Sequence, residues 1–121
     1  MRDRILLIDD DPLVLKSFTS LLLRAGYFVI PASGYEEALK AFTTEDFDLI
    51  LSDIRIPGKN GVEIVSEMQK MVSKAGKKEL PIIFITGYAE DGIQMNASFL
   101  GEILTKPIDT DKLLTVIRDY L

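Results

Sequence analysis

The fold is best predicted from residues 5–12, which read Ile5-Leu6-Leu7-Ile8-Asp9-Asp10-Asp11-Pro12. Four consecutive apolar residues are typical of a strand that is buried on both faces, as in a parallel sheet covered by helices. Three aspartates follow, and a proline suits the first turn of a helix. The sequence therefore predicts a buried strand, an acidic turn and a helix near the amino terminus.

Apolar runs and helical patterns alternate along the rest of the chain. The predicted strands after the first are residues 27–30, 47–51 and 82–85, with a weaker run at 103–104. Apolar residues at helical spacing predict helices over residues 12–25, 33–42, 61–74 and 109–121. The pattern between Thr86 and Lys106 is weak, so a helix in that interval is expected to be short or mobile.

Local signals mark several helix ends. Ser33 and Glu36 have the spacing of a capping box at the start of the second helix. Gly26 can adopt a left-handed conformation just after the first helix, and Asp109 is placed to cap the last one. The stripe of the last helix that is expected to face the sheet contains Leu113, Val116, Ile117, Tyr120 and Leu121.

The alternation of strands and helices predicts the fold class. Strands joined through helices make right-handed crossovers and form a mainly parallel sheet with helices on both faces. The expected class is therefore α/β, with a doubly wound sheet. Ligands of such sheets bind beyond the carboxyl ends of the strands.

The composition excludes several classes of protein. The 121 residues are 47% hydrophobic and 27% charged, which suits one globular domain. The apolar runs are far too short to span a bilayer and no signal peptide is recognisable, so we expect a cytoplasmic protein. The chain has no cysteine and no histidine, and its net charge of −5 argues against direct nucleic-acid binding.

Acidic and polar residues follow the predicted strands. In strand order they are Asp9 and Asp10, then Asp53, Thr86 and Lys106. Parallel topology gathers them at one edge, where close carboxylates repel by about 4 kcal/mol per pair at an effective dielectric constant of about 20. A divalent cation and Lys106 would balance the three aspartates. Mg²⁺ fits better than Zn²⁺ because the chain offers neither thiolate nor imidazole.

Four motifs occur in a fixed order. They are Ile5-Leu6-Leu7-Ile8-Asp9-Asp10-Asp11-Pro12, Asp53-Ile54-Arg55-Ile56-Pro57-Gly58-Lys59-Asn60-Gly61, Ile85-Thr86-Gly87-Tyr88 and Leu104-Thr105-Lys106-Pro107. Together they resemble the receiver domains of bacterial two-component signalling over essentially the whole chain. The resemblance implies a flavodoxin-like fold with five parallel strands in the order 2-1-3-4-5. It also implies a cis bond between Lys106 and Pro107 and a helix-capping role for Asp11.

The resemblance implies that Asp53 accepts a phosphoryl group. Thr86 would donate a hydrogen bond to that group and Lys106 would pair with it. Gly87, which is small and has a free amide, would leave the approach open.

A Mg²⁺ site is also implied by the resemblance. Asp10, Asp53 and the backbone carbonyl of Arg55 would hold the ion. Asp9 would reach it through water.

The implied function is a phosphorylation-dependent signalling switch in a phosphorelay. A histidine kinase or histidine phosphotransfer protein would supply the phosphoryl group, and the altered surface would act on an output protein or fused domain. The domain would catalyse its own phosphorylation and dephosphorylation without being an enzyme for a separate substrate. We expect residues 1–121 to form this one domain with no output domain in the chain, while the formation of a homodimer stays open. The last two motifs also resemble those of receivers attached to hybrid histidine kinases.

Two alternatives stay open. Ile103 lies where many receivers carry an aromatic residue that switches with phosphorylation, which favours a receiver-like interaction module that works without phosphate. Asp9 and Asp11 form an Asp-x-Asp pattern similar to that of haloacid-dehalogenase-type phosphatases, although the chain is short for such an enzyme. Labelling of Asp9→Asn and Asp53→Asn variants would distinguish that phosphatase from a receiver.

Overall fold

The computed structural model describes residues 2–87 and 100–121. Within these residues the strands are β1 (Arg4–Ile8), β2 (Phe28–Ala32), β3 (Leu49–Asp53), β4 (Ile82–Thr86) and β5 (Glu102–Thr105). The helices are α1 (Pro12–Arg24), α2 (Tyr35–Thr44), α3 (Gly61–Lys74) and α5 (Thr110–Tyr120). The short helix expected between β4 and β5 falls largely on residues 88–99, which lie outside the described part of the chain.

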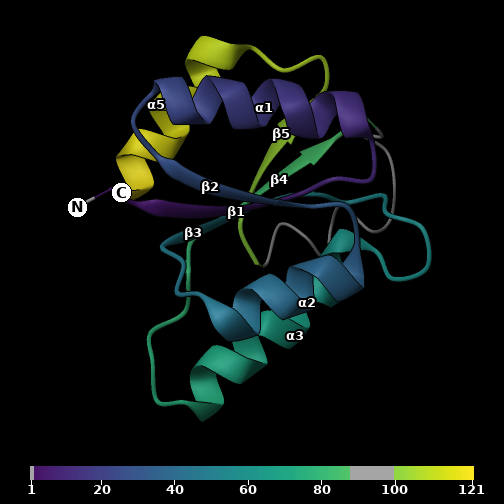
Figure 1. The fold of residues 1–121 in the computed structure, drawn as a ribbon, viewed down its shortest axis with the longest axis vertical. Coiled ribbons are helices and arrows are strands. Elements are labelled where there is room, and N and C mark those ends of the chain that lie inside the picture. The colour runs from purple at the N-terminus through teal and green to yellow at the C-terminus, as the bar shows by residue number, and fades with distance from the viewer. Residues whose placement is uncertain (1, 88–99) are drawn as a thin grey trace.

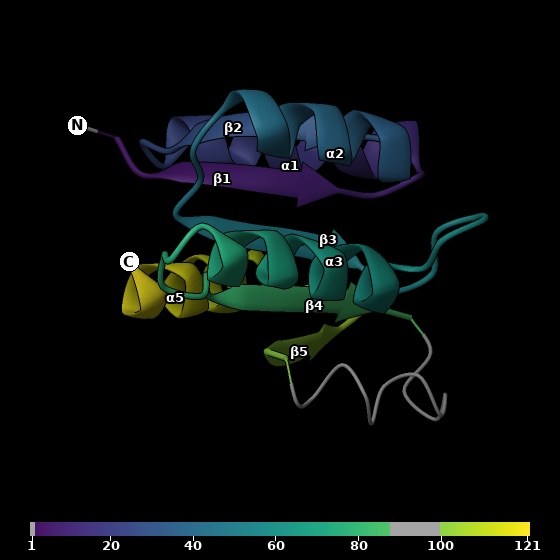
Figure 2. The same cartoon turned by 90° about the horizontal axis from the view of Figure 1, so that it is seen from below.

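The five strands form one parallel sheet in the order β2-β1-β3-β4-β5. Figures 1 and 2 show the helices in two layers, with α1 and α5 on one face of the sheet and α2 and α3 on the other. The predicted α/β class and the predicted strand order are therefore confirmed. Among the described helices, none is long and apolar enough to cross a membrane.

The strand β1 shows why the apolar runs are continuous. Leu6 and Ile8 belong to the core beneath α2 and α3, whereas Ile5 and Leu7 belong to the core beneath α1 and α5. Successive side chains of a strand point to opposite faces, so a strand between two helix layers needs apolar residues at every position. Ile103 of β5 is partly buried and packs against the α2 and α3 core.

Four strands end one or two residues later than their apolar runs predict: β2 at Ala32, β3 at Asp53, β4 at Thr86 and β5 at Thr105. β3 continues through Ser52 and Asp53, which pair with β4, because the Ser52 hydroxyl donates a 2.8 Å hydrogen bond to the Asp53 carbonyl and so satisfies its polarity in the core. β2 continues through Pro31, and as an edge strand it has a free side on which proline is tolerated. Asp53 and Thr86 are consequently the last residues of their strands instead of the first residues after them.

The predicted capping box of α2 is wrong. Gly34 is the N-cap and has no side chain to accept a hydrogen bond, so the helix starts one residue later than the pattern requires. The backbone amide and the hydroxyl of Ser33 instead donate to the carboxylate of Glu37, at 3.0 and 2.9 Å. Glu36 takes no part in this arrangement.

Other predicted helix ends are confirmed. Asp11 and Asp109 cap α1 and α5 through their side chains, and Gly26 follows α1 with a φ of 98°. The bond between Lys106 and Pro107 is cis, as the resemblance implies. In α5 the predicted stripe is correct at its start, where the buried residues are Leu113 and Ile117, but not at its end, where Tyr120 and Leu121 are 46% and 39% exposed.

Candidate functional site

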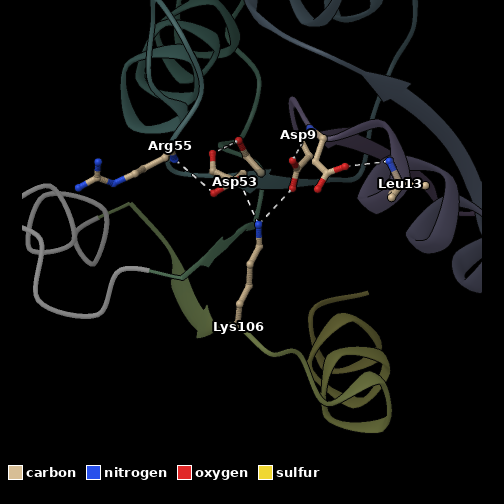
Figure 3. Close-up of polar contacts among 7 residues, drawn as sticks. Asp9, Leu13, Asp53, Arg55 and Lys106 are labelled. Carbon is tan, nitrogen blue, oxygen red and sulfur yellow. Dashed lines mark hydrogen bonds and ion pairs between the residues drawn. The ribbon is translucent and has the colours of Figure 1, made fainter.

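Side chains from three strands meet at the carboxyl edge of the sheet. Asp9 follows β1, Asp53 ends β3 and Lys106 follows β5. The Lys106 ammonium nitrogen lies 3.2 Å from Asp53 Oδ2 and 3.6 Å from Asp9 Oδ2. Figure 3 shows the lysine side chain reaching across the edge between the two carboxylates. The predicted convergence of these residues is confirmed.

Three carboxylates form a cluster suited to a hard cation. One oxygen each of Asp9, Asp10 and Asp53 can be chosen so that all three lie within 4.8 Å of one another. Asp9 and Asp53 are only 2% and 7% exposed, whereas Asp10 is exposed to solvent. Buried carboxylates that are this close require compensating positive charge.

Burial and neighbouring charge shift the proton equilibria of this edge. Burial raises the pKa of the Asp9 carboxyl, an effect opposed by the 2.9 Å hydrogen bond that it accepts from the Asp11 amide. Partial burial opposes the charge of Lys106, but the carboxylates of Asp53 and Asp9 outweigh it and raise the pKa of the ammonium group. At this edge the protonated, charged form of Lys106 is therefore stabilised, whereas the ionised form of Asp9 is destabilised.

The connection from β3 to α3 starts against the site. The Arg55 amide donates a 3.2 Å hydrogen bond to Asp53 Oδ1. Figure 3 shows the Arg55 side chain extending away from Asp53. The backbone of Arg55, and not its guanidinium, is therefore the part that faces the Asp53 carboxylate.

Thr86 and Gly87 lie at the same edge. Thr86 ends β4 and is fully buried, and its carbonyl accepts a 2.7 Å hydrogen bond from the amide of Lys106. This bond fixes the start of the segment that carries the lysine. A Cβ at Gly87 would lie 4.0 Å from Lys106 Cδ, an ordinary contact, so crowding by the described residues does not require glycine there.

Gly61 is a residue of this edge that the sequence analysis placed only at a helix start. A Cβ on it would lie 2.0 Å from the carbonyl oxygen of Asp53, and its amide donates a 2.8 Å hydrogen bond to the carbonyl of Ile54. The absence of a side chain therefore lets α3 start directly against the backbone of Asp53. The sequence did contain a signal for this role. Glycine has a low helix propensity, so its presence as the first residue of a predicted helix indicates that a side chain would not fit there.

Comparisons with known proteins agree with this geometry. The family model of the response regulator receiver domain matches residues 5–118. The chain is 33% identical over 119 residues to the transcriptional regulatory protein GlrR of Escherichia coli (strain K12), covering 97% of this chain and 26% of GlrR. It is 29% identical over 123 residues to sporulation initiation phosphotransferase F of Bacillus subtilis (strain 168), covering 100% of this chain and 95% of that protein. The chain thus spans about a quarter of GlrR.

Solved structures of receivers share the fold. The response regulator TrrA of Thermotoga maritima, in complex with Mg²⁺-BeF, superimposes with a TM-score of 0.84 at 29% identity, covering 98% of this chain and 99% of that chain. The chemotaxis protein CheY4 of Vibrio cholerae gives a TM-score of 0.87 at 26% identity and covers 100% of both chains. The resemblance to receivers of hybrid histidine kinases stays a prediction. The fold, the acidic edge and the family model together show that this chain belongs to the response regulator receiver domain family.

Proposed function

We propose that Asp53 is the phosphoacceptor of this receiver in a two-component phosphorelay and that its phosphorylation requires Mg²⁺. One observation carries the proposal: the Lys106 ammonium lies 3.2 Å from Asp53 Oδ2, beside the cluster of three carboxylates. A carboxylate at the carboxyl edge of the sheet, with cations to neutralise the incoming group, is equipped to act as a nucleophile toward phosphorus.

The transfer step balances without a proton from Asp53. An Asp53 carboxylate oxygen attacks the phosphorus of a phosphohistidine donor and forms a P–O bond, while the P–N bond breaks and the imidazole retains the electron pair. Lys106 would pair with the transferred phosphoryl oxygens. Thr86 would donate a hydrogen bond to them, and Gly87 would leave the approach to Asp53 open. The same residues would support slow self-catalysed loss of the phosphoryl group to water.

The donor set fits Mg²⁺ as the cofactor. Asp10, Asp53 and the Arg55 carbonyl would hold the ion, with Asp9 reaching it through water. The oxygens of the acidic cluster are hard ligands, and the chain contains no cysteine or histidine that would favour a softer metal. When bound, the ion would neutralise the carboxylates and the equatorial oxygens of the phosphoryl group. The response regulator TrrA, which shares the fold of this chain, was solved in complex with Mg²⁺-BeF, and this supports the assignment of Mg²⁺.

A histidine kinase or a histidine phosphotransfer protein is the proposed donor. The relative named a sporulation initiation phosphotransferase matches this chain over 95% of its own length, which supports a place in a phosphorelay. The proposed recipient of the signal is an output protein or a fused domain, in line with the relatives named as transcriptional regulators. The single receiver domain over residues 1–121 stays a prediction.

Intact-mass spectrometry after incubation with acetyl phosphate tests the assignment. The wild type with Mg²⁺ should gain about 80 Da, one phosphoryl group, while Asp53→Asn and a metal-free control should not. Asp9→Asn should still form the adduct at saturating Mg²⁺, because it retains Asp53 and Asp9 is assigned a contact with the ion only through water. An adduct that survives in Asp53→Asn but disappears in Asp9→Asn would instead support the phosphatase-like alternative. Absence of both the adduct and Mg²⁺ binding in the wild type would favour the phosphate-independent module.

A further inference from the structure

A second polar cluster lies on the side of the sheet that α2 and α3 cover (Figure 1). It consists of Tyr35, Lys59 and Glu67, which come from the start of α2, the connection between β3 and α3, and the body of α3. The Tyr35 hydroxyl donates to Glu67 Oε1 at 2.7 Å, and the Lys59 ammonium donates to Glu67 Oε2 at 2.8 Å. That ammonium also lies 4.2 Å from the centroid of the Tyr35 ring. Each member of the cluster therefore contacts the other two.

The contacts within this cluster hold its members in complementary charge states. The hydrogen bond with Glu67 raises the pKa of the Lys59 ammonium, and the hydrogen bonds from Lys59 and Tyr35 lower the pKa of Glu67. The hydrogen bond to Glu67 also raises the pKa of the Tyr35 phenol. At neutral pH the cluster thus contains a cation, an anion and a protonated phenol. Because Lys59 can face both an anion and an aromatic ring, its position is defined by two kinds of attraction.

Lys59 lies on the segment that leaves the phosphoacceptor. Residues 54–60 form this connection, and the side chains of Ile54 and Ile56 in its first half are buried. The second half turns sharply at Gly58, where φ is 83°, and the Lys59 amide donates a 3.2 Å hydrogen bond to the Pro57 carbonyl. Figures 1 and 2 show this connection projecting beyond the carboxyl end of β3. The tip at Pro57 and Gly58 is exposed, and the side chain of the next residue, Lys59, contacts both α2 and α3.

We infer that the Tyr35, Lys59 and Glu67 cluster positions the connection between β3 and α3 and thereby sets the affinity of the acidic edge for Mg²⁺. The inference rests on the proposed function, in which the Arg55 carbonyl is a metal ligand on this same connection. Residues that hold a metal ligand in place from outside its coordination sphere commonly change metal affinity when they are removed. Tyr35, Lys59 and Glu67 are positioning residues in this scheme, and none of them contacts the ion.

The sign of the expected effect separates positioning from simple electrostatics. Lys59→Met removes a positive charge from the surroundings of a cation site, and Coulomb's law alone would strengthen Mg²⁺ binding. If Lys59 positions the connection, its loss weakens binding instead. Tyr35→Phe keeps the ring and changes no charge, so weaker binding in that variant also cannot come from net charge. Lys59→Arg should retain the contacts with Glu67 and Tyr35 and restore most of the affinity.

The test measures Mg²⁺ binding to the unphosphorylated protein by isothermal titration calorimetry. We expect the Kd to rise about three- to tenfold in Lys59→Met and about twofold in Tyr35→Phe, below the range typical for loss of a direct partner of a metal ligand. Acetyl phosphate should still give the full adduct in both variants at saturating Mg²⁺. The matched control is Lys77→Met, which removes an exposed lysine 3.5 Å from Asp46 and should leave the Kd unchanged.

Each result decides the inference. Unchanged or tighter binding in Lys59→Met overturns it, as does an equal change in Lys77→Met. If Lys59→Met does not fold, an unchanged Kd in Tyr35→Phe overturns it as well. Normal Mg²⁺ binding by the wild type without an adduct at Asp53 contradicts the proposed function but leaves the positioning role standing. A wild type that binds no Mg²⁺ removes both.

Discussion

Two strand-to-helix connections contribute carboxylates to the same site, but they differ in length and in the contacts that hold them in place. Between β1 and α1 the chain passes directly from Asp9 to Asp11, and Asp11 caps the helix by accepting a hydrogen bond from the Leu13 amide at 2.9 Å. Between β3 and α3 it makes the longer excursion of residues 54–60, which Figure 1 shows as a projecting loop. The turn of the first connection is held by side-chain hydrogen bonds between residues two apart, and Asp9 additionally pairs with Lys106 and donates to the Ala32 carbonyl. The second also depends on Tyr35 and Glu67, which lie in other elements.

This difference shows which structural features can be predicted from a local sequence pattern. Hydrogen bonds between near neighbours follow from residue type and spacing, because the partners are adjacent in any helix start. Contacts between distant segments depend on how helices pack, which no local spacing encodes. The connection between β3 and α3 is therefore the region where substitutions are expected to have the less obvious consequences.

The largest effect is expected where the second connection enters α3. Gly61→Ala would place a Cβ 2.0 Å from the Asp53 carbonyl oxygen. Because the clash is with backbone, no change of rotamer relieves it, and we expect the free energy of unfolding to fall by about 3 kcal/mol. Urea denaturation measures the loss. Gly34→Ala is the control, since no described atom lies within 4 Å of a Cβ there, and it should cost less than about 1 kcal/mol as an N-cap change. Equal losses in the two variants would refute the steric explanation.

A smaller effect of opposite sign is expected in the first connection. Burial raises the pKa of Asp9 from its ordinary value of 3.8, so the folded state binds this proton more tightly than the unfolded chain. Stability from Asp9 is therefore complete below the ordinary value and decreases as the pH rises through the interval up to the raised pKa. Asp9→Asn removes the charge, and at about pH 7 it should raise the free energy of unfolding by about 1.5 kcal/mol, a fraction of one close carboxylate repulsion.

Denaturation with urea at about pH 7 and at about pH 4 checks this prediction. The advantage of Asp9→Asn over the wild type should shrink at the lower pH, because Asp9 then becomes protonated in the folded protein. Mg²⁺ should stabilise the wild type more than the variant, since a bound ion relieves the same repulsion. An advantage that grows on acidification would show that the charge of Asp9 stabilises the fold.

The site was predictable as far as the sheet topology determines it. Buried apolar runs indicated parallel strands, and parallel strands bring Asp9, Asp53 and Lys106 to one edge whatever the details of packing. The end of β3 was missed because Ser52 is polar but satisfies its hydroxyl inside the core. The start of α2 was missed because a glycine occupies its N-cap, and a side-chain pattern cannot identify a cap that has no side chain.

The smallest predicted effect concerns the two N-caps. Asp11→Ala and Asn60→Ala each remove a side chain that accepts a hydrogen bond from the first turn of its helix, and each should lower the free energy of unfolding by about 1 kcal/mol. Asn60 directly follows Lys59, and its amide also donates to Glu63 Oε1 at 3.3 Å in a capping box. We therefore expect Asn60→Ala and Lys59→Met to couple, whereas Asp11→Ala and Lys59→Met should be additive.

Double-mutant cycles measured by urea denaturation resolve this contrast. Neighbouring residues that order the same backbone segment share part of their effect, so the Asn60 and Lys59 cycle should give an interaction energy of about 0.5–1 kcal/mol. The Asp11 and Lys59 cycle should stay within about 0.3 kcal/mol of additivity, because the two residues lie on separate connections with no partner in common. Additivity in both cycles would mean that Asn60 and Lys59 act independently. The cap would then stabilise α3 alone, and the ordering of the β3 to α3 connection would rest on the side-chain cluster by itself.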